Sequence, residues 1–162
     1  MGIALTDDGL LPAGTDVAEV LARGDVRELT AVWNTYGRRS FYQRALDERS
    51  GLTEKARQGL QELTEELAEL AEVSPVQALE ANRRLAELLT GRRWYVMQDA
   101  REHGATWTEI GAAVDLTKQG AQDWYRRKIE QQEKYAPDVH GRDSARAVLK
   151  DDPTAPPTPG AT

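Results

Sequence analysis

Polar and cationic side chains crowd a short stretch in the last third of the chain. Residues 117–128 contain four basic residues and one acid, whereas the whole chain carries a net charge of −6. Gln pairs bidentately with adenine, Lys contacts guanine, and Thr reaches a thymine methyl group or a phosphate. The chemistry offered is therefore the reading of a DNA major groove. The residues expected to contact DNA are Thr106, Thr117, Lys118, Gln119, Gln122, Asp123, Arg126, Arg127 and Lys128.

Asp123 is the acid within this basic stretch. A carboxylate in the major groove is tolerated opposite a cytosine amino group or beside a cation, here Lys118 or Arg127. Further arginines before the stretch are expected to reach the DNA backbone, which positions a protein without specifying a sequence. They are Arg92, Arg93 and Arg101.

Two short helices separated by a turn would position these side chains, and the sequence contains the signals for both. Thr106 and Glu109 have the capping-box spacing that starts a helix. Thr117 is expected to cap the second helix. Asp115 lies in the turn, where a left-handed backbone usually requires Gly but tolerates Asp. Gly111 has no side chain, which lets the two helices approach closely.

Apolar residues at helical spacing predict a small core beneath these helices. Ile110, Ala113 and Val114 share one face of the first helix, and Leu116 is expected to fill the turn from beneath. Tyr125 is open between the edge of the core and a phosphate contact. The other residues expected in this core are Trp94, Trp107, Ala121, Trp124 and Lys128 or Ile129.

The run GATWTEIGAAVDLTKQGAQDWYRR resembles the helix-turn-helix of a broad group of actinobacterial DNA-binding regulators and, more loosely, region 4 of sigma factors. The resemblance covers about 30 residues of the C-terminal part and implies a recognition helix over 117–127. It departs from the pattern at Asp115, where glycine is usual, and at Gly120, where alanine is usual. The matching residues are Gly104, Trp107, Ile110, Gly111, Leu116, Thr117, Lys118, Gln119 and Ala121.

The fold class expected is all-α: a helical N-terminal region, a trihelical helix-turn-helix unit and a disordered C-terminal tail. Between Pro12 and Pro137 only Pro75 interrupts the chain, and it follows Ser74 as at a helix start. Five prolines beyond residue 135 indicate disorder. The expected boundaries are 1–24 for a segment with a short helix, 25–73 for a helical dimerisation or partner region, 74–135 for a long helix with the DNA-binding domain, and 136–162 for the tail.

Four helices are expected before the helix-turn-helix, over 15–23, 25–49, 53–72 and 74–103, the last either continuous or interrupted at residues 90 and 91. The third contains a heptad-like row of leucines flanked by glutamates. This row either packs against neighbouring helices of the same chain or contributes to a homodimer interface. Its members, spaced 3, 4 and 3 residues apart, are Leu60, Leu63, Leu67 and Leu70.

The charge distribution supports an alternative function. Residues 52–73 contain six acids and two bases, and an acidic surface repels phosphate. The alternative is a helical protein–protein interaction module whose acidic helices bind a protein partner, without direct reading of DNA. If the DNA interpretation is right, a homodimer reading two half-sites of double-stranded DNA is expected, because one motif gives little specificity.

Other classes of function lack the residues they need. The chain has no Cys, and His103 and His140 stand far apart, so no metal site and no cofactor is expected. No nucleophile–base pair or phosphate-binding loop indicates an enzyme. The N-terminus lacks the basic start of a signal peptide, and no apolar run is long enough to cross a bilayer. We therefore expect a cytoplasmic, nucleoid-associated protein without a membrane partner.

Overall fold

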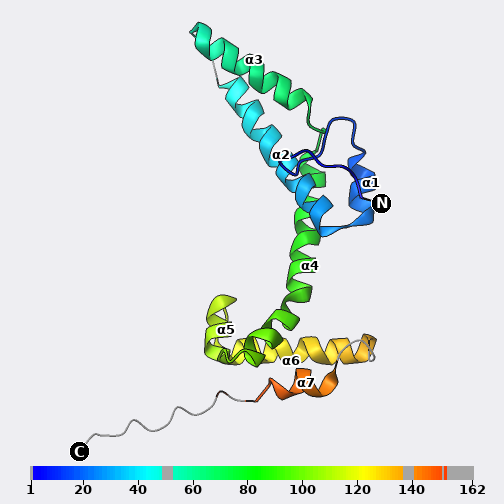
Figure 1. Ribbon diagram of the computed structural model, residues 1–162, viewed down its shortest axis with the longest axis vertical. Coiled ribbons are helices and arrows are strands. Elements are labelled where there is room, and N and C mark those ends of the chain that lie inside the picture. Colours follow the sequence, from blue (N-terminus) through cyan, green and yellow to red (C-terminus); the bar gives the residue numbers. More distant parts are fainter. Residues whose placement is uncertain (1, 49–52, 137–140, 151, 153–162) are drawn as a thin grey trace, which may run out of the picture. The chain divides into compact units, whose positions relative to one another are not determined.

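The computed structural model describes residues 2–48, 53–136, 141–150 and 152, and their regular structure is helical (Figure 1). The expected all-α class is confirmed. No helix within these ranges is both long and apolar enough to cross a membrane. The helices are α1 (Val17–Arg23), α2 (Val26–Asp47), α3 (Glu54–Ala68), α4 (Pro75–Glu102), α5 (Trp107–Ala113), α6 (Lys118–Tyr135) and α7 (Arg142–Ala147).

The chain divides into two compact units, Met1–Thr90 and Gly91–Thr162. The division falls inside α4, whereas composition placed a boundary at residue 73. Helix α4 is continuous, so of the two alternatives the uninterrupted helix is the one observed. We call these parts the N-terminal unit and the C-terminal unit.

Local capping signals explain where the helices begin. Asp16 accepts hydrogen bonds from two backbone amides at the start of α1, and Asp25 does the same for α2. The hydroxyl of Ser74 accepts from the amide of Gln77 at 3.2 Å, and the Gln77 side chain accepts from the Ser74 amide at 2.9 Å. Each cap satisfies amides that a helix leaves unpaired in its first turn.

The core of the N-terminal unit includes the segment that precedes α1. Leu11 is fully buried with Leu29 and Val32 of α2. Its amide donates to the Thr35 hydroxyl at 2.8 Å, and its carbonyl accepts from the Ala71 amide at 2.9 Å. Residues far apart in sequence therefore hold this segment in place.

Helix α3 ends at Ala68, short of the expected residue 72. Leu70 lies beyond the helix, forms a β-bridge with Pro12 and is 8% exposed. Of the two roles that the sequence left open for the leucine row, Leu70 therefore has the first, packing within the chain, where it lies beside the N-terminal segment. The other three leucines of the row, Leu60, Leu63 and Leu67, lie on α3 and are half-buried.

Helices α2 and α3 run antiparallel, side by side (Figure 1). Polar bonds join them. The hydroxyl of Tyr42 donates to Glu66 at 2.6 Å, and Arg39 donates to the carbonyls of Leu67 and Leu70 at 2.7 and 2.9 Å. No residue of α3 is fully buried, so this helix contributes less to the core than α2 does.

The C-terminal unit has a core of its own, built from the end of α4 together with α5, α6 and α7. Aromatic rings dominate it: Trp107 and Tyr125 are fully buried, with ring centroids 5.5 Å apart. The remaining buried apolar residues of this core are Trp94, Met97, Ile110, Ala121, Ile129 and Ala145.

Helix α7 corrects the expectation of a disordered tail from residue 136. Its Ala145 is buried, and the Ala145 carbonyl accepts from the hydroxyl of Tyr125 at 2.9 Å. Arg146 adds a bidentate ion pair with Glu133 of α6, at 2.7 and 2.8 Å. The rest of the expected tail, including His140, lies largely outside the described residues.

Candidate functional site

The first helix of the predicted pair, α5, begins with the expected capping box. The Thr106 hydroxyl accepts from the Glu109 amide at 3.2 Å, and the Thr106 amide donates to the Glu109 carboxylate at 2.7 Å. The bonds from the amide and hydroxyl of Thr106 hold the pKa of Glu109 below its usual range. The capping role predicted for Thr106 is therefore confirmed, and its contact with DNA stays a prediction.

The turn between α5 and α6 has the backbone that the sequence predicted. Asp115 has a φ of 56°, in the left-handed region. Gly111 approaches the turn closely: a Cβ placed there would lie 2.7 Å from the carbonyl oxygen of Leu116. The Leu116 side chain is 37% exposed, so the expectation that it fills the turn from beneath is wrong.

Helix α6 is capped and buried along one face. The Thr117 hydroxyl accepts from the Gly120 amide at 3.0 Å, as expected of a cap. The inner face consists of Ala121, Tyr125 and Ile129, spaced four residues apart and at most 3% exposed. The sequence placed Trp124 on this face, where Tyr125 lies instead. Tyr125 is therefore a core residue, and its burial raises the pKa of its hydroxyl.

Trp124 lies at the edge of the core with cations over its ring. The Arg93 guanidinium is 5.6 Å from the ring centroid, and the Lys128 ammonium is 5.7 Å from it. Lys128 is half-buried in this contact. Cation–π attraction therefore ties one predicted DNA contact, Lys128, and one predicted backbone contact, Arg93, to the same indole.

The face of α6 opposite its buried residues is polar. Gln119, Arg126 and Arg127 are exposed along it. Arg126 forms an ion pair with Asp123 at 2.7 Å, whereas the sequence suggested Lys118 or Arg127 as the cation beside this acid. Gln122 is half-buried at the side of the helix.

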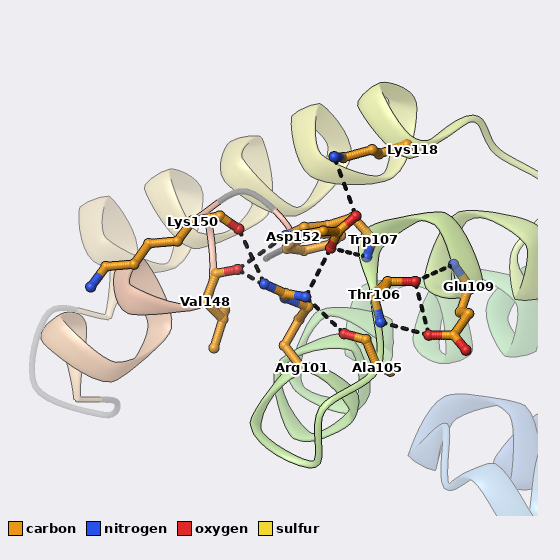
Figure 2. A network of polar contacts seen from close by, with 9 residues as sticks. All are labelled: Arg101, Ala105, Thr106, Trp107, Glu109, Lys118, Val148, Lys150 and Asp152. Carbon is orange, nitrogen blue, oxygen red and sulfur yellow. Dashed lines mark hydrogen bonds and ion pairs between the residues drawn. The ribbon is translucent and has the colours of Figure 1, made fainter. Parts of the chain in front are cut away.

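Lys118, the first residue of α6, faces an acid from the C-terminal segment (Figure 2). Its ammonium lies 3.2 Å from Oδ2 of Asp152. Oδ1 of Asp152 accepts from the Trp107 backbone amide at 2.7 Å and from Arg101 at 3.0 Å. The bond from the Trp107 amide, with smaller contributions from Lys118 and Arg101, holds the pKa of Asp152 below its usual range.

Arg101 is fully engaged within the unit, so the expectation that it reaches DNA is wrong. Its guanidinium donates to the carbonyls of Ala105 at 2.8 Å, Val148 at 3.3 Å and Lys150 at 3.1 Å, in addition to Asp152 (Figure 2). Its side chain is only 11% exposed. The planar fork of Arg suits this bridging of several acceptors.

Sequence reasoning missed the contribution of residues 141–150 and 152 to this site. The signal was present: Ala145, Val148 and Leu149 have helical apolar spacing and pack on the core of the unit. The prolines that follow led to the prediction of disorder instead. Asp152 itself carries no local signal, because its partners lie 34 to 51 residues earlier in the chain.

The residues expected to contact DNA thus have different environments. Thr106 and Thr117 cap helices, Lys118 faces Asp152, and Lys128 is stacked on Trp124. Those exposed on the outer face of α6 include Gln119, Arg126 and Arg127. No protein-family model, curated protein or solved structure matches the chain.

Proposed function

We propose that the C-terminal unit binds double-stranded DNA by placing α6 in the major groove, as a transcriptional regulator would. The observation that carries this proposal is the outer face of α6. An amide and two guanidinium groups, from Gln119, Arg126 and Arg127, project from a helix whose opposite face is buried. Such groups hydrogen-bond to base edges and to phosphates.

The dimensions and support of α6 suit this role. Its 18 residues correspond to a rod about 27 Å long, and the groove of B-DNA is wide enough for one helix. The Thr117 cap and the buried Tyr125 fix the rod against the rest of the unit. A rigid helix loses little conformational entropy on binding, which favours affinity.

The proposal includes a homodimer, because one short helix reads few base pairs. The surface proposed for the second copy is the leucine row of α3 without Leu70, namely Leu60, Leu63 and Leu67. These side chains are half-buried within one chain, so part of their apolar surface remains available. Two copies related by a two-fold axis would present two α6 helices to two half-sites.

Fluorescence anisotropy with a short labelled duplex of mixed sequence, over a series of salt concentrations, tests DNA binding. Arg127→Gln should weaken binding and lower the salt slope by about one, because the slope counts phosphates neutralised by cations. Gln119→Ala should instead alter the preference among duplex sequences with little change in slope. The matched control is Arg83→Gln, which removes an exposed arginine of the N-terminal unit. Parent-like binding by Arg127→Gln and Gln119→Ala would contradict the proposal.

A second candidate function, the protein-interaction module, is favoured by exposed apolar residues on α4. Val76, Leu79 and Leu89 of the N-terminal unit are 73, 64 and 62% exposed. Large exposed apolar side chains are typical of protein contact surfaces when they cluster. The same anisotropy experiment separates the two candidates, because a protein-interaction module would not bind the duplex even at low salt.

A further inference from the structure

Backbone hydrogen bonds hold the segment after α7 against Arg101 and Trp107. The carbonyl of Val148 accepts from the indole Nε1 of Trp107 at 3.1 Å and from Arg101 at 3.3 Å. The carbonyl of Lys150 accepts from Arg101 at 3.1 Å (Figure 2). These bonds do not involve the side chain of Asp152. The Asp152 carboxylate therefore lies beside Lys118 at the end of a segment whose backbone carbonyls form hydrogen bonds of their own.

Lys118 is the first basic residue along α6. Like the other basic residues of the stretch 117–128, it was expected to contact DNA. A carboxylate and a phosphodiester group each carry one negative charge and present two acceptor oxygens, so they compete for the same ammonium group. Both the Asp152 carboxylate and a DNA phosphate therefore fit the same partner. The Lys118 side chain is 41% exposed, which leaves the ammonium accessible to a ligand from solvent.

We propose that Asp152 is an intramolecular competitor for DNA phosphate at Lys118. With the carboxylate in place, Lys118 is neutralised by the chain itself; when DNA binds, its phosphate replaces the carboxylate. The apparent affinity is then reduced by the fraction of molecules in which Lys118 is occupied. This inference rests on the proposed DNA binding. It adds that the chain's own Asp152–Lys118 ion pair lowers the affinity for DNA.

Asp152→Asn tests the inference directly. The substitution removes the charge but keeps a side-chain oxygen that can accept from the Trp107 amide. We expect affinity for the mixed-sequence duplex to rise by about three- to tenfold at low salt, and the salt slope to increase by about one, because one more phosphate is neutralised. The matched control is Asp143→Asn on α7, which removes the same charge from an exposed position. It should leave the slope unchanged.

A double-mutant cycle identifies the cation. In a Lys118→Gln background, Asp152→Asn should no longer raise affinity, because the competed ammonium is absent. If Asp152→Asn matches Asp143→Asn while the parent binds DNA, the inference is overturned and the proposed function stands. If neither parent nor variants bind the duplex, the proposed function fails and the inference fails with it.

A second measurement does not depend on the stability of any variant. The backbone amide of Trp107 reports on its bond to Asp152, so its resonance in a ¹⁵N–¹H spectrum of the parent should move when saturating duplex is added. This change is expected because the carboxylate that accepts from the Trp107 amide loses its ion pair with Lys118 when a phosphate takes its place. A resonance that stays in place with DNA bound overturns the inference.

Discussion

Glu28 is a buried carboxylate whose two oxygens both have partners. It is 4% exposed, and Oε1 accepts from the Ile3 amide at 2.9 Å while Oε2 accepts from Arg23 at 3.0 Å. The bonds from Arg23 and from the Ile3 amide lower its pKa from the ordinary value of 4.5. Through the Ile3 amide this carboxylate ties the start of the chain to α2.

Replacing this carboxylate should destabilise the N-terminal unit. In Glu28→Gln one of the two donors loses its acceptor inside the protein, which costs about 1–3 kcal/mol at neutral pH. Because folding lowers the pKa of Glu28, its contribution is present above pH 4.5 and is lost as the pH falls through the lower folded-state value. The difference in unfolding free energy between parent and variant, measured in urea, should therefore shrink below pH 4.5.

The control for Glu28→Gln uses the same arginine. Glu19 pairs with Arg23 at 2.8 Å, but its side chain is 71% exposed. An exposed pair contributes at most about 1 kcal/mol, so Glu19→Gln should have a small effect at every pH. Equal effects of the two substitutions would show that burial of Glu28 does not carry the stabilisation.

At the scale of elements, the sequence predicted best what neighbouring residues decide. The capping box at Thr106, the helix start at Ser74 and the left-handed turn at Asp115 each depend on residues within a few positions. Leu70 was misplaced because a β-bridge to a distant segment, and no local signal, ends α3 before it. The shift of the inner face of α6 from Trp124 to Tyr125 has a similar origin, since α7 accepts the hydroxyl bond that lets Tyr125 be buried.

The crossing of α5 and α6 gives a prediction at this scale. In Gly111→Ala the new methyl group would lie 2.7 Å from the Leu116 carbonyl oxygen, so the backbone of the turn must shift. Overpacking costs about 1–3 kcal/mol, and because backbone atoms are met here the cost should lie in the upper part of that range, above the roughly 1 kcal/mol that alanine gains over glycine in a helix. Thermal unfolding followed by circular dichroism should show a lower midpoint for the C-terminal unit.

The matched control for Gly111→Ala is Gly91→Ala in α4. A Cβ at Gly91 would meet nothing within 4 Å, so only the helix-propensity gain applies. We expect this variant to be as stable as the parent or more stable by up to about 1 kcal/mol. A stabilised Gly111→Ala would contradict the close approach of the turn to α5.

At the scale of the whole molecule, the net negative charge belongs to one unit. Residues 1–90 contain sixteen acids and ten bases, which accounts for the entire net charge of −6, and residues 91–162 contain eleven of each. The unit proposed to bind DNA is therefore neutral overall, and its cations are concentrated on α6. The acidic unit opposes non-specific contact with phosphate, so the proposed interface must supply the affinity.

The same charge distribution makes the proposed dimer respond to salt in the opposite sense to DNA binding. Two acidic N-terminal units repel each other, and salt screens this repulsion, so dimerisation through α3 should strengthen as salt increases.

Light scattering of the parent should give twice the chain mass of 18.0 kDa. In Leu63→Glu with Leu67→Glu, two half-buried apolar side chains become acids on a surface that already contains glutamates, and the mass should fall to that of one chain. The control is Leu79→Glu, at a 64% exposed position of α4. The mass of this control should stay that of a dimer. If Leu63→Glu with Leu67→Glu remains folded and dimeric, the dimer contact lies elsewhere. The leucine row then serves only packing within one chain.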